Sequence, residues 1–445
     1  MSSLDSLVSL AITLESTTLS RAGYGTPAIL DYNTRFTDTL VRSYGSLAAM
    51  TTDGFATTDL AYIAATKVFS QNPKPSTLKI FRRTNAPAET MVLTPTTAVS
   101  TTYSGTLAIT GGSAQDWTYT SSATGTAATI ANGLTAAIAA LLSYSGNLVV
   151  SGATATGVVT LTAVTGKHFA LDEISSTFSD VQDETPDVSS VANLAACEAI
   201  DSDYYGLIST SKGGPEIVAL SAAIEARRKI LIIGSMDKDV YNSSALTDVA
   251  GVAKTAGYDR TAIFAQKGNH MAQGDAAIMG NWLPYTPGSE TMHLKTISGV
   301  AADTYTDTQA GYLNTKNALY YKTVANVNVL LWGKVASGEY LDVVRFIDWL
   351  YSNIQEDVFV LVSSNSKIPF TDAGVAQVEG IIRAVLARGI SVGGLAASPA
   401  PNVIVPLVAD VATADKAARN LTPITFTATL AGAIHITSIT GTVSV

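Results

Sequence analysis

The second half of the chain alternates short apolar runs with segments of helical periodicity. Residues 204–209 and 230–233 are apolar runs of strand length, and residues 261–265 continue the series. Between the first two runs, residues 216–228 have helical spacing after a Gly-Gly-Pro sequence at 213–215, a common way for a helix to begin. Such alternation is typical of helices packed on a mostly buried sheet, so it predicts a layered α/β core.

Further elements are predicted towards the end of this region. Residues 340–354 have the pattern of a helix that is apolar on nearly every side, so we expect more than one neighbour to cover it. Residues 327–335 and 358–362 are predicted as strands on either side of this helix. Residues 372–388 are predicted as the last long helix, which Gly389 would stop. Its apolar stripe consists of Val375, Val378, Ile382, Val385 and Leu386.

The composition changes abruptly in the middle of the chain. Residues 86–171 contain only three charged residues, whereas 14% of the whole chain is charged. Strand-like runs surround one helical segment at 127–142, and an acidic connector follows at 172–187. These breaks predict a β-rich peripheral domain at residues 86–187 that is inserted into the core.

Both ends of the chain show the alternation of a half-buried strand, in residues 8–15 and again in residues 424–430. The apolar residues of these terminal arms are Val8, Leu10, Ile12, Leu14, Ile424, Phe426, Ala428 and Leu430. The prediction is a multidomain α/β (α+β) protein. Its parts are an N-terminal arm (1–20), a first core part (21–85), the insert (86–187), a second core part (188–420) and a C-terminal arm (421–445).

The sequence offers little support for catalysis or for a bound cofactor or metal. The four histidines are scattered, and neither a nucleophile elbow nor a phosphate loop occurs. Residues 23–28 fit a GxGxxA pattern, but an extended run follows where a dinucleotide site needs a helix, so a glycine turn is expected. The Asp-Lys-Asp sequence at 237–239 is interpreted as a solvated turn. We therefore expect no enzyme and no cofactor, although a catalytic group assembled from distant residues would leave no such motif.

Charge and cysteine content argue against other classes of protein. The net charge is −9 and Lys and Arg are not clustered, which argues against nucleic-acid binding. Cys197 is the only cysteine, so an internal disulfide is impossible and folding in a reducing cytoplasm is the simplest interpretation. No apolar run is long enough for a transmembrane helix.

One continuous stretch of the sequence carries a family likeness. Residues 320–390 include VNVLLWGKVASGEYLDVVRFIDWLYSNIQEDVFV and end in IIRAVLARGI. This stretch resembles the core of contractile phage tail sheath proteins, in which a strand ending in a Trp-Gly pair precedes a polar turn and a helix. The segments TTLSRAGYGTPAIL, FSQNPKPSTLKIFRR and PITFTATLAGAIHITSITGTVSV are similar to a sheath subgroup with a short N-terminal arm. The positions that match the core pattern are Trp332, Gly333, Tyr340, Val343 or Val344, and Arg345.

The resemblance implies a structural protein that assembles as stacked rings around an inner tail tube and shortens when the baseplate triggers contraction. Its partners would be further copies of itself, the tail tube, the baseplate and the tail terminator, without nucleic acid or membrane insertion. It would reside in the virion tail after assembly in the host cytoplasm. Another tail, baseplate or surface-array structural protein stays open as the alternative.

The resemblance also implies roles for the arms and for the last helix. A terminal strand gains main-chain hydrogen bonds and a buried face on the edge of a neighbour's sheet, so the arm residues are predicted to join subunits. The insert would face outward. The helix at 372–388 would face the tail tube, with Arg383 and Arg388 as candidate contacts. The local alternative is that Arg383 pairs with Glu379 and that Arg388 complements the dipole at the helix C-terminus.

Overall fold

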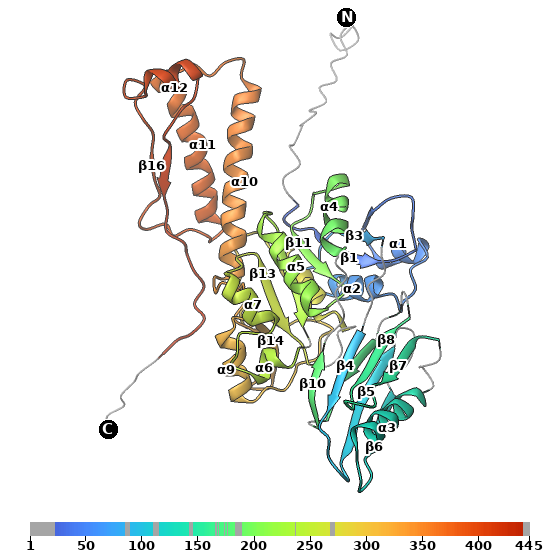
Figure 1. The fold of residues 1–445 in the computed structure, drawn as a ribbon. Coiled ribbons are helices and arrows are strands. Elements are labelled where there is room, and N and C mark those ends of the chain that lie inside the picture. Colours follow the sequence, from blue (N-terminus) through green and yellow to red (C-terminus); the bar gives the residue numbers. More distant parts are fainter. Residues whose placement is uncertain are drawn as a thin grey trace, which may run out of the picture.

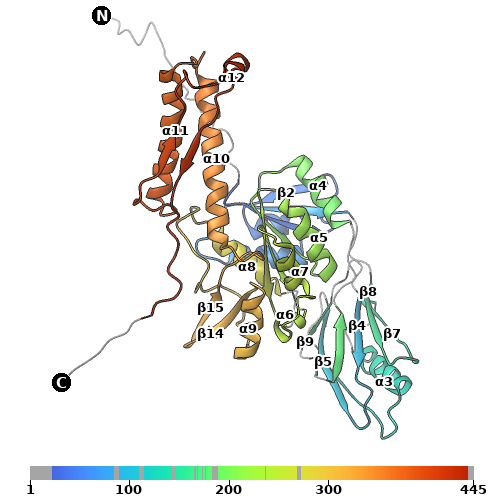
Figure 2. The same cartoon turned by 60° about the vertical axis from the view of Figure 1, so that its left-hand side comes forward.

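The computed structural model describes residues 23–84, 90–109, 115–141, 146–164, 167, 169–172, 174–175, 177–182, 189–235, 237–267 and 272–438 (Figure 1). This part of the chain consists of an α/β core, a group of small sheets from the middle of the chain, and two long helices that stand away from the core. The small sheets and the long helices lie on opposite sides of the core in both views (Figures 1 and 2). No helix in the described part is long and apolar enough to cross a membrane.

The core is built on one eight-stranded sheet with the strand order β15-β14-β13-β12-β11-β1-β3-β2. The six central strands are parallel, whereas β15 and β2 at the two edges are antiparallel to their neighbours. The predicted α/β fold class is therefore confirmed. The strands are β1 (Pro27–Tyr32), β2 (Val41–Tyr44), β3 (Leu78–Arg83), β11 (Gly206–Ser209), β12 (Ile230–Ser235), β13 (Thr261–Ala265), β14 (Leu319–Val324) and β15 (Val327–Leu331).

Both faces of this sheet are buried under helices, which explains why its strands are apolar runs without alternation. In β12, Ile230 and Ile232 belong to the hydrophobic cluster on one face, with α2 and α8, while Leu231 and Ile233 belong to the other, with α4, α5 and α7. The helices around the sheet are α1 (Leu47–Thr52), α2 (Leu60–Phe69), α4 (Ser190–Ile200), α5 (Gly214–Glu225), α6 (Asp239–Asn242), α7 (Val249–Ala256), α8 (Gly274–Trp282) and α9 (Asp307–Thr315).

The middle of the chain forms two further sheets with the orders β10-β4-β8-β7 and β6-β5-β9, and α3 packs on them. They share a hydrophobic cluster of their own that includes Leu93, Trp117 and Leu134. The chain leaves the core after β3 and re-enters it at α4, where the amide and hydroxyl groups of Thr84 both donate to Asn193 Oδ1, at 3.1 and 3.0 Å. The elements are β4 (Thr90–Pro95), β5 (Thr102–Ile109), β6 (Gln115–Thr120), α3 (Ala127–Ala139), β7 (Leu148–Gly152), β8 (Val159–Ala163), β9 (Phe169–Asp172) and β10 (Phe178–Gln182).

The remaining described elements form a C-terminal module, which we define as α10 with everything that follows it. Its two long antiparallel helices pack against each other around buried residues such as Phe346, Val385 and Leu386 (Figure 2). More than one neighbour covers α10, as expected, because the core packs on its first turn and α11 packs on its middle, while Ile347 and Tyr351 are 52% and 44% exposed in the single chain. The elements are α10 (Leu341–Ser364), α11 (Asp372–Ser391), β16 (Asn402–Ile404), α12 (Thr413–Ala418) and β17 (Thr425–Thr427).

Three sequence predictions for this region are wrong. The strand predicted at 358–362 is the last part of α10, because no glycine or proline interrupts the helix; Phe359, Val360 and Val362 are exposed there, so they form no buried strand. Helix α11 does not stop at Gly389, which is buried where a Cβ atom would come 3.2 Å from the Phe346 ring. The strand predicted at 327–335 ends at Leu331, because Trp332 and Gly333 turn the chain with φ values of +73° and +63°.

Candidate assembly site

The terminal arms are only partly described. Of the eight predicted arm residues, Val8, Leu10, Ile12 and Leu14 lie outside the described residues. In the C-terminal arm, β17 pairs with β16 of the same chain, with Phe426 opposite Val403. Among the described residues this sheet has two strands, so each strand keeps an edge without a strand partner. Phe426 and Leu430 are 42% and 40% exposed, whereas Ile424 packs against the module's hydrophobic cluster.

The chain after β17 lies against its own subunit, and we call residues 429–438 the C-terminal segment. The amide of Ala396 donates to the Thr429 carbonyl at 2.8 Å, and the amide of Ala431 donates to the Gly394 carbonyl at 3.0 Å. Further along, His435 Nε2 lies 3.0 Å from Thr291 Oγ1 of the core. The C-terminal arm thus has contacts within its own subunit as well as exposed apolar side chains.

Helix α11 carries the two predicted tube contacts. Its apolar stripe is buried as expected, with Val378 partly buried. Arg383 Nε donates to Glu379 Oε1 at 2.7 Å, and its Nη2 also donates to the Val403 carbonyl at 3.1 Å. Arg388 forms an ion pair with Asp357 of α10, a partner that the sequence did not suggest. Both arginines are therefore tied within the module, yet their side chains remain 48% and 40% exposed.

Arg345 joins the C-terminal module to the core, and its side chain is fully buried. It donates to Glu290 Oε1 at 2.6 Å. Burial lowers the pKa of Arg345 and raises the pKa of Glu290, and the attraction between the two charges opposes both shifts. The guanidinium also donates to four main-chain carbonyl oxygens at 2.8–3.2 Å, those of Tyr24, Trp282, Leu283 and Tyr285.

One turn further along α10, Asp348 also binds the core. We call the contacts of Arg345 and Asp348 with the core the joint. Both of its carboxylate oxygens accept from Arg260, at 2.7 and 2.9 Å, and Oδ2 also accepts from the Tyr205 hydroxyl at 2.9 Å. The Tyr24 hydroxyl donates to the main-chain carbonyl of Asp348 at 2.7 Å. The base of α10 is thus fixed to several parts of the core by charge-assisted hydrogen bonds, which are the strong kind. The family pattern identified Arg345 from the sequence, but Asp348 was missed. Its signal in the sequence was a charged residue within an otherwise apolar helical stretch.

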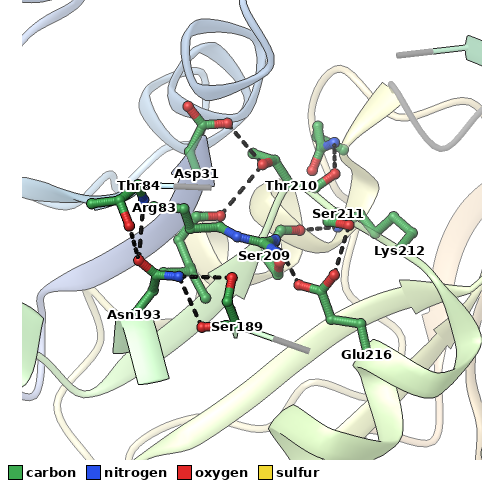
Figure 3. Close-up of polar contacts among 12 residues, drawn as sticks. Asp31, Arg83, Thr84, Ser189, Asn193, Ser209, Thr210, Ser211, Lys212 and Glu216 are labelled. Carbon is green, nitrogen blue, oxygen red and sulfur yellow. Dashed lines mark hydrogen bonds and ion pairs between the residues drawn. The ribbon is translucent and has the colours of Figure 1, made fainter. Parts of the chain in front are cut away.

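The carboxyl edge of the central strands is where sheets of this kind commonly bind ligands, and in this chain buried ion pairs occupy it (Figure 3). Arg83 and Glu216 are 2.7 Å apart and almost completely buried, and Lys212 pairs with Asp275. The hydroxyl of Ser211 donates to Glu216 at 2.8 Å. These charges neutralise each other, so their arrangement is that of a structural network.

The two weaker motifs of the sequence also have structural explanations. The glycine-rich residues 23–28 form a turn closed by the amide of Thr26 and the Gly23 carbonyl at 2.8 Å, and β1 follows, as predicted. Asp237 Oδ1 accepts from the amide of Asp239 at 2.9 Å, which stabilises the local turn. Among the residues described, no group of three or more His, Cys, Asp and Glu is placed to hold a metal ion.

Comparison with known proteins finds a similarity to tail sheath proteins in the C-terminal module. Residues 341–399, which contain α10 and α11, match the family model described as "E217 tail sheath protein gp31-like, C-terminal domain". The resemblance to tail sheath proteins that the sequence suggested is thereby confirmed. A comparison with curated protein sequences finds no match.

Two solved structures share the fold over nearly the whole chain. A chain of the anti-feeding prophage baseplate aligns with a TM-score of 0.54 and 13% identity, covering 98% of this chain and 99% of that one. A chain of an extracellular contractile injection system, the PVC sheath complex in the contracted state, aligns with a TM-score of 0.52 and 11% identity over 97% and 96% of the two chains. A sheath tail protein from Desulfitobacterium hafniense aligns with a TM-score of 0.49 and 10% identity over 89% and 93%.

Proposed function

We propose that this chain is the structural subunit of a contractile tail sheath, which polymerises as a helical array around a tail tube and shortens to drive the tube through a host envelope. One observation is the main support for this proposal. The residues that match the tail sheath family, 341–399, form a pair of helices that stands away from the core beside an exposed two-stranded ribbon. A projecting module with open strand edges suits linkage between unlike surfaces of neighbouring copies, which builds an open helix.

The joint around Arg345 and Asp348 supports a contraction in which the core and the base of α10 stay rigid and the contacts between subunits change. Because these side chains bind several parts of the core, the base of α10 moves with the core as one body. Rearrangement between subunits then occurs at the predicted terminal arms, which link neighbours without fixing their orientation. The partners of this assembly are further copies of the chain, the tail tube, the baseplate and the tail terminator, in a virion tail assembled in the host cytoplasm.

A baseplate or surface-array subunit is the alternative function. The observation in its favour is that one chain with the same fold comes from a baseplate structure. Electron microscopy of the purified protein separates the two functions. A sheath subunit forms long hollow tubes by itself and decorates isolated tail tubes, whereas single discs or flat arrays would support the alternative. Monomers with enzymatic turnover would contradict both.

Deletion of the insert is expected to spare tube formation. Because Thr84 and Asn193 are hydrogen-bonded across the two connections, a short Gly-Ser linker in place of residues 86–187 leaves the core strands in register. Electron microscopy of the deletion variant should show tubes of normal length with a thinner outer wall. A folded core that no longer assembles would instead place the insert in a contact between subunits.

Reversal of the charges of Arg383 and Arg388 is expected to impair decoration of the tail tube while leaving polymerisation of the sheath alone intact. Each contact is weak and screened by salt, but the effect sums over many subunits along an acidic tube. The measurement is co-sedimentation of R383E/R388E with tail tubes at low and at physiological salt.

A matched control tests whether the loss of the ion pairs within the module, rather than the loss of a tube contact, explains this result. The variant R383E/R388E/E379R/D357R restores opposite charges within the module with the positions exchanged. If the arginines contact the tube, this variant also fails to decorate it. Recovery of decoration would show that the internal ion pairs are what matters, and unchanged decoration by R383E/R388E would reject the contact altogether.

A further inference from the structure

The C-terminal segment ends its path along the core in a slot lined by aromatic rings. The His435 ring lies 4.6 Å from the His293 ring at an interplanar angle of 32°, and 4.7 Å from the Tyr340 ring, edge-on, at 85°. The slot brings together the arm, the loop between α8 and α9, and the start of α10. Because two imidazoles in contact cannot both be charged without repulsion, the geometry of the slot favours neutral histidines.

A second contact fixes the protonation of His293. Its Nδ1 accepts the main-chain N–H of Trp332 at 2.9 Å, and its ring stacks on the Trp332 ring at 5.3 Å. An imidazole that accepts at Nδ1 carries its proton on Nε2 and is neutral. A proton on Nδ1 would face the N–H group and abolish this hydrogen bond, and His293 is only 8% exposed, so solvent cannot compensate.

The lysines around the slot act in the same direction. Burial lowers the pKa of both histidines; His435 and Lys295 lower the pKa of His293 further, and Lys334 does so for His435. The Lys334 ammonium lies over the rings of Trp332 and Tyr340, at 5.8 and 5.3 Å. The carboxylates that lie nearby belong to Glu290 and Asp342 in the wall of the adjoining cavity, and to Glu339, which accepts the amide of Tyr340.

We propose that His293 and His435 form a protonation-sensitive latch, which holds residues 429–438 against the core at neutral pH and releases them in mild acid. A histidine with a lowered pKa in the docked state takes up its proton more readily when released. Docking is therefore complete above the ordinary histidine pKa of about 6.5 and weakens as the pH falls through it. Release also opens a cavity of about 440 Å³, because residues 430–433 form part of its wall.

Hydrogen exchange of the purified full chain tests the latch within one subunit, independently of the proposed function. Exchange of the peptide that covers residues 429–438 is compared at pH 7.5 and 5.5 after correction for the intrinsic rate. The expected result is protection at pH 7.5 and an opening equilibrium that rises by up to about tenfold at pH 5.5, because the released His435 takes up a proton. Buried strand β12 is the internal reference and should stay protected at both pH values. No protection at pH 7.5, or equal protection at both, would overturn the proposal.

Three variants separate the latch from a general effect of acid. His435→Phe keeps a ring in the slot but cannot take up a proton, so its response to pH should be lost. His435→Lys carries a permanent charge and should leave the segment unprotected even at pH 7.5. Asp342→Asn removes a nearby carboxyl whose pKa burial raises to about 6, and it should leave the response unchanged. A wild-type response in His435→Phe, or protection at pH 7.5 in His435→Lys, would contradict the latch.

Discussion

Removal of residues 423–445 is expected to abolish tube formation and to leave a folded, soluble core. Several apolar side chains of this arm are exposed in the single chain, since Phe426, Ile434 and Ile436 are 42%, 87% and 74% exposed. We expect this arm to contribute a strand edge and apolar side chains to the contact with a neighbouring copy. Circular dichroism should show an unchanged α/β spectrum, while size-exclusion chromatography shows monomers and electron microscopy shows no tubes. Removal of residues 1–16 is expected to have the same effect.

The insert deletion is the matched control for this truncation. It removes many more residues than either arm, yet we expect it to keep assembly, because it lies outside the predicted arms. Normal tubes from either arm truncation would contradict a role of that arm between subunits. A C-terminal truncation that unfolds would show that β17 chiefly completes its own module.

Arg345→Met is expected to destabilise the protein by about 3–5 kcal/mol, the usual cost of breaking a buried ion pair from one side. The substitution leaves the Glu290 carboxylate buried without its partner, and four main-chain carbonyl groups lose a donor. The measurement is urea denaturation followed by tryptophan fluorescence, in which Trp282 beside the joint is a convenient reporter.

Arg388→Met is the control for that experiment. It also breaks an ion pair between an arginine and a carboxylate, but its side chain is 40% exposed, and such pairs contribute at most about 1 kcal/mol. The double variant R345M/E290Q should recover part of the loss, because it no longer buries an uncompensated charge. Equal urea midpoints for Arg345→Met and wild type would refute the role assigned to the joint.

The core of the fold was predictable because its signals are local. Strands β11, β12 and β13 are short apolar runs that are buried on both faces, and α5 repeats its apolar residues at helical spacing, so the α/β alternation follows from neighbouring residues alone. The prediction failed where the local pattern misleads. Residues 358–362 have strand-forming side chains but continue α10, which no glycine or proline interrupts, and Gly389 lies inside α11, where it packs beside Phe346.

The contacts of the candidate site were less predictable for a related reason. The pair of Arg383 and Glu379 is four residues apart on one helix and was foreseen as an alternative. The pair of Arg388 and Asp357 depends on how two helices pack, and the joint of Arg345 joins residues more than 300 positions apart in the chain. Spacing along a sequence contains no information about such distances. The neutral histidine pair was likewise invisible, since its members are scattered in the sequence.

The hydrogen bonds between Thr84 and Asn193 have a practical consequence for engineering. Two connections that meet at one point form a natural graft site, at which any compact domain with adjacent termini can replace the middle of the chain. In an assembled tube each copy would then carry one passenger domain at a regular spacing. The chain thus offers a scaffold for ordered display of enzymes or antigens along a filament.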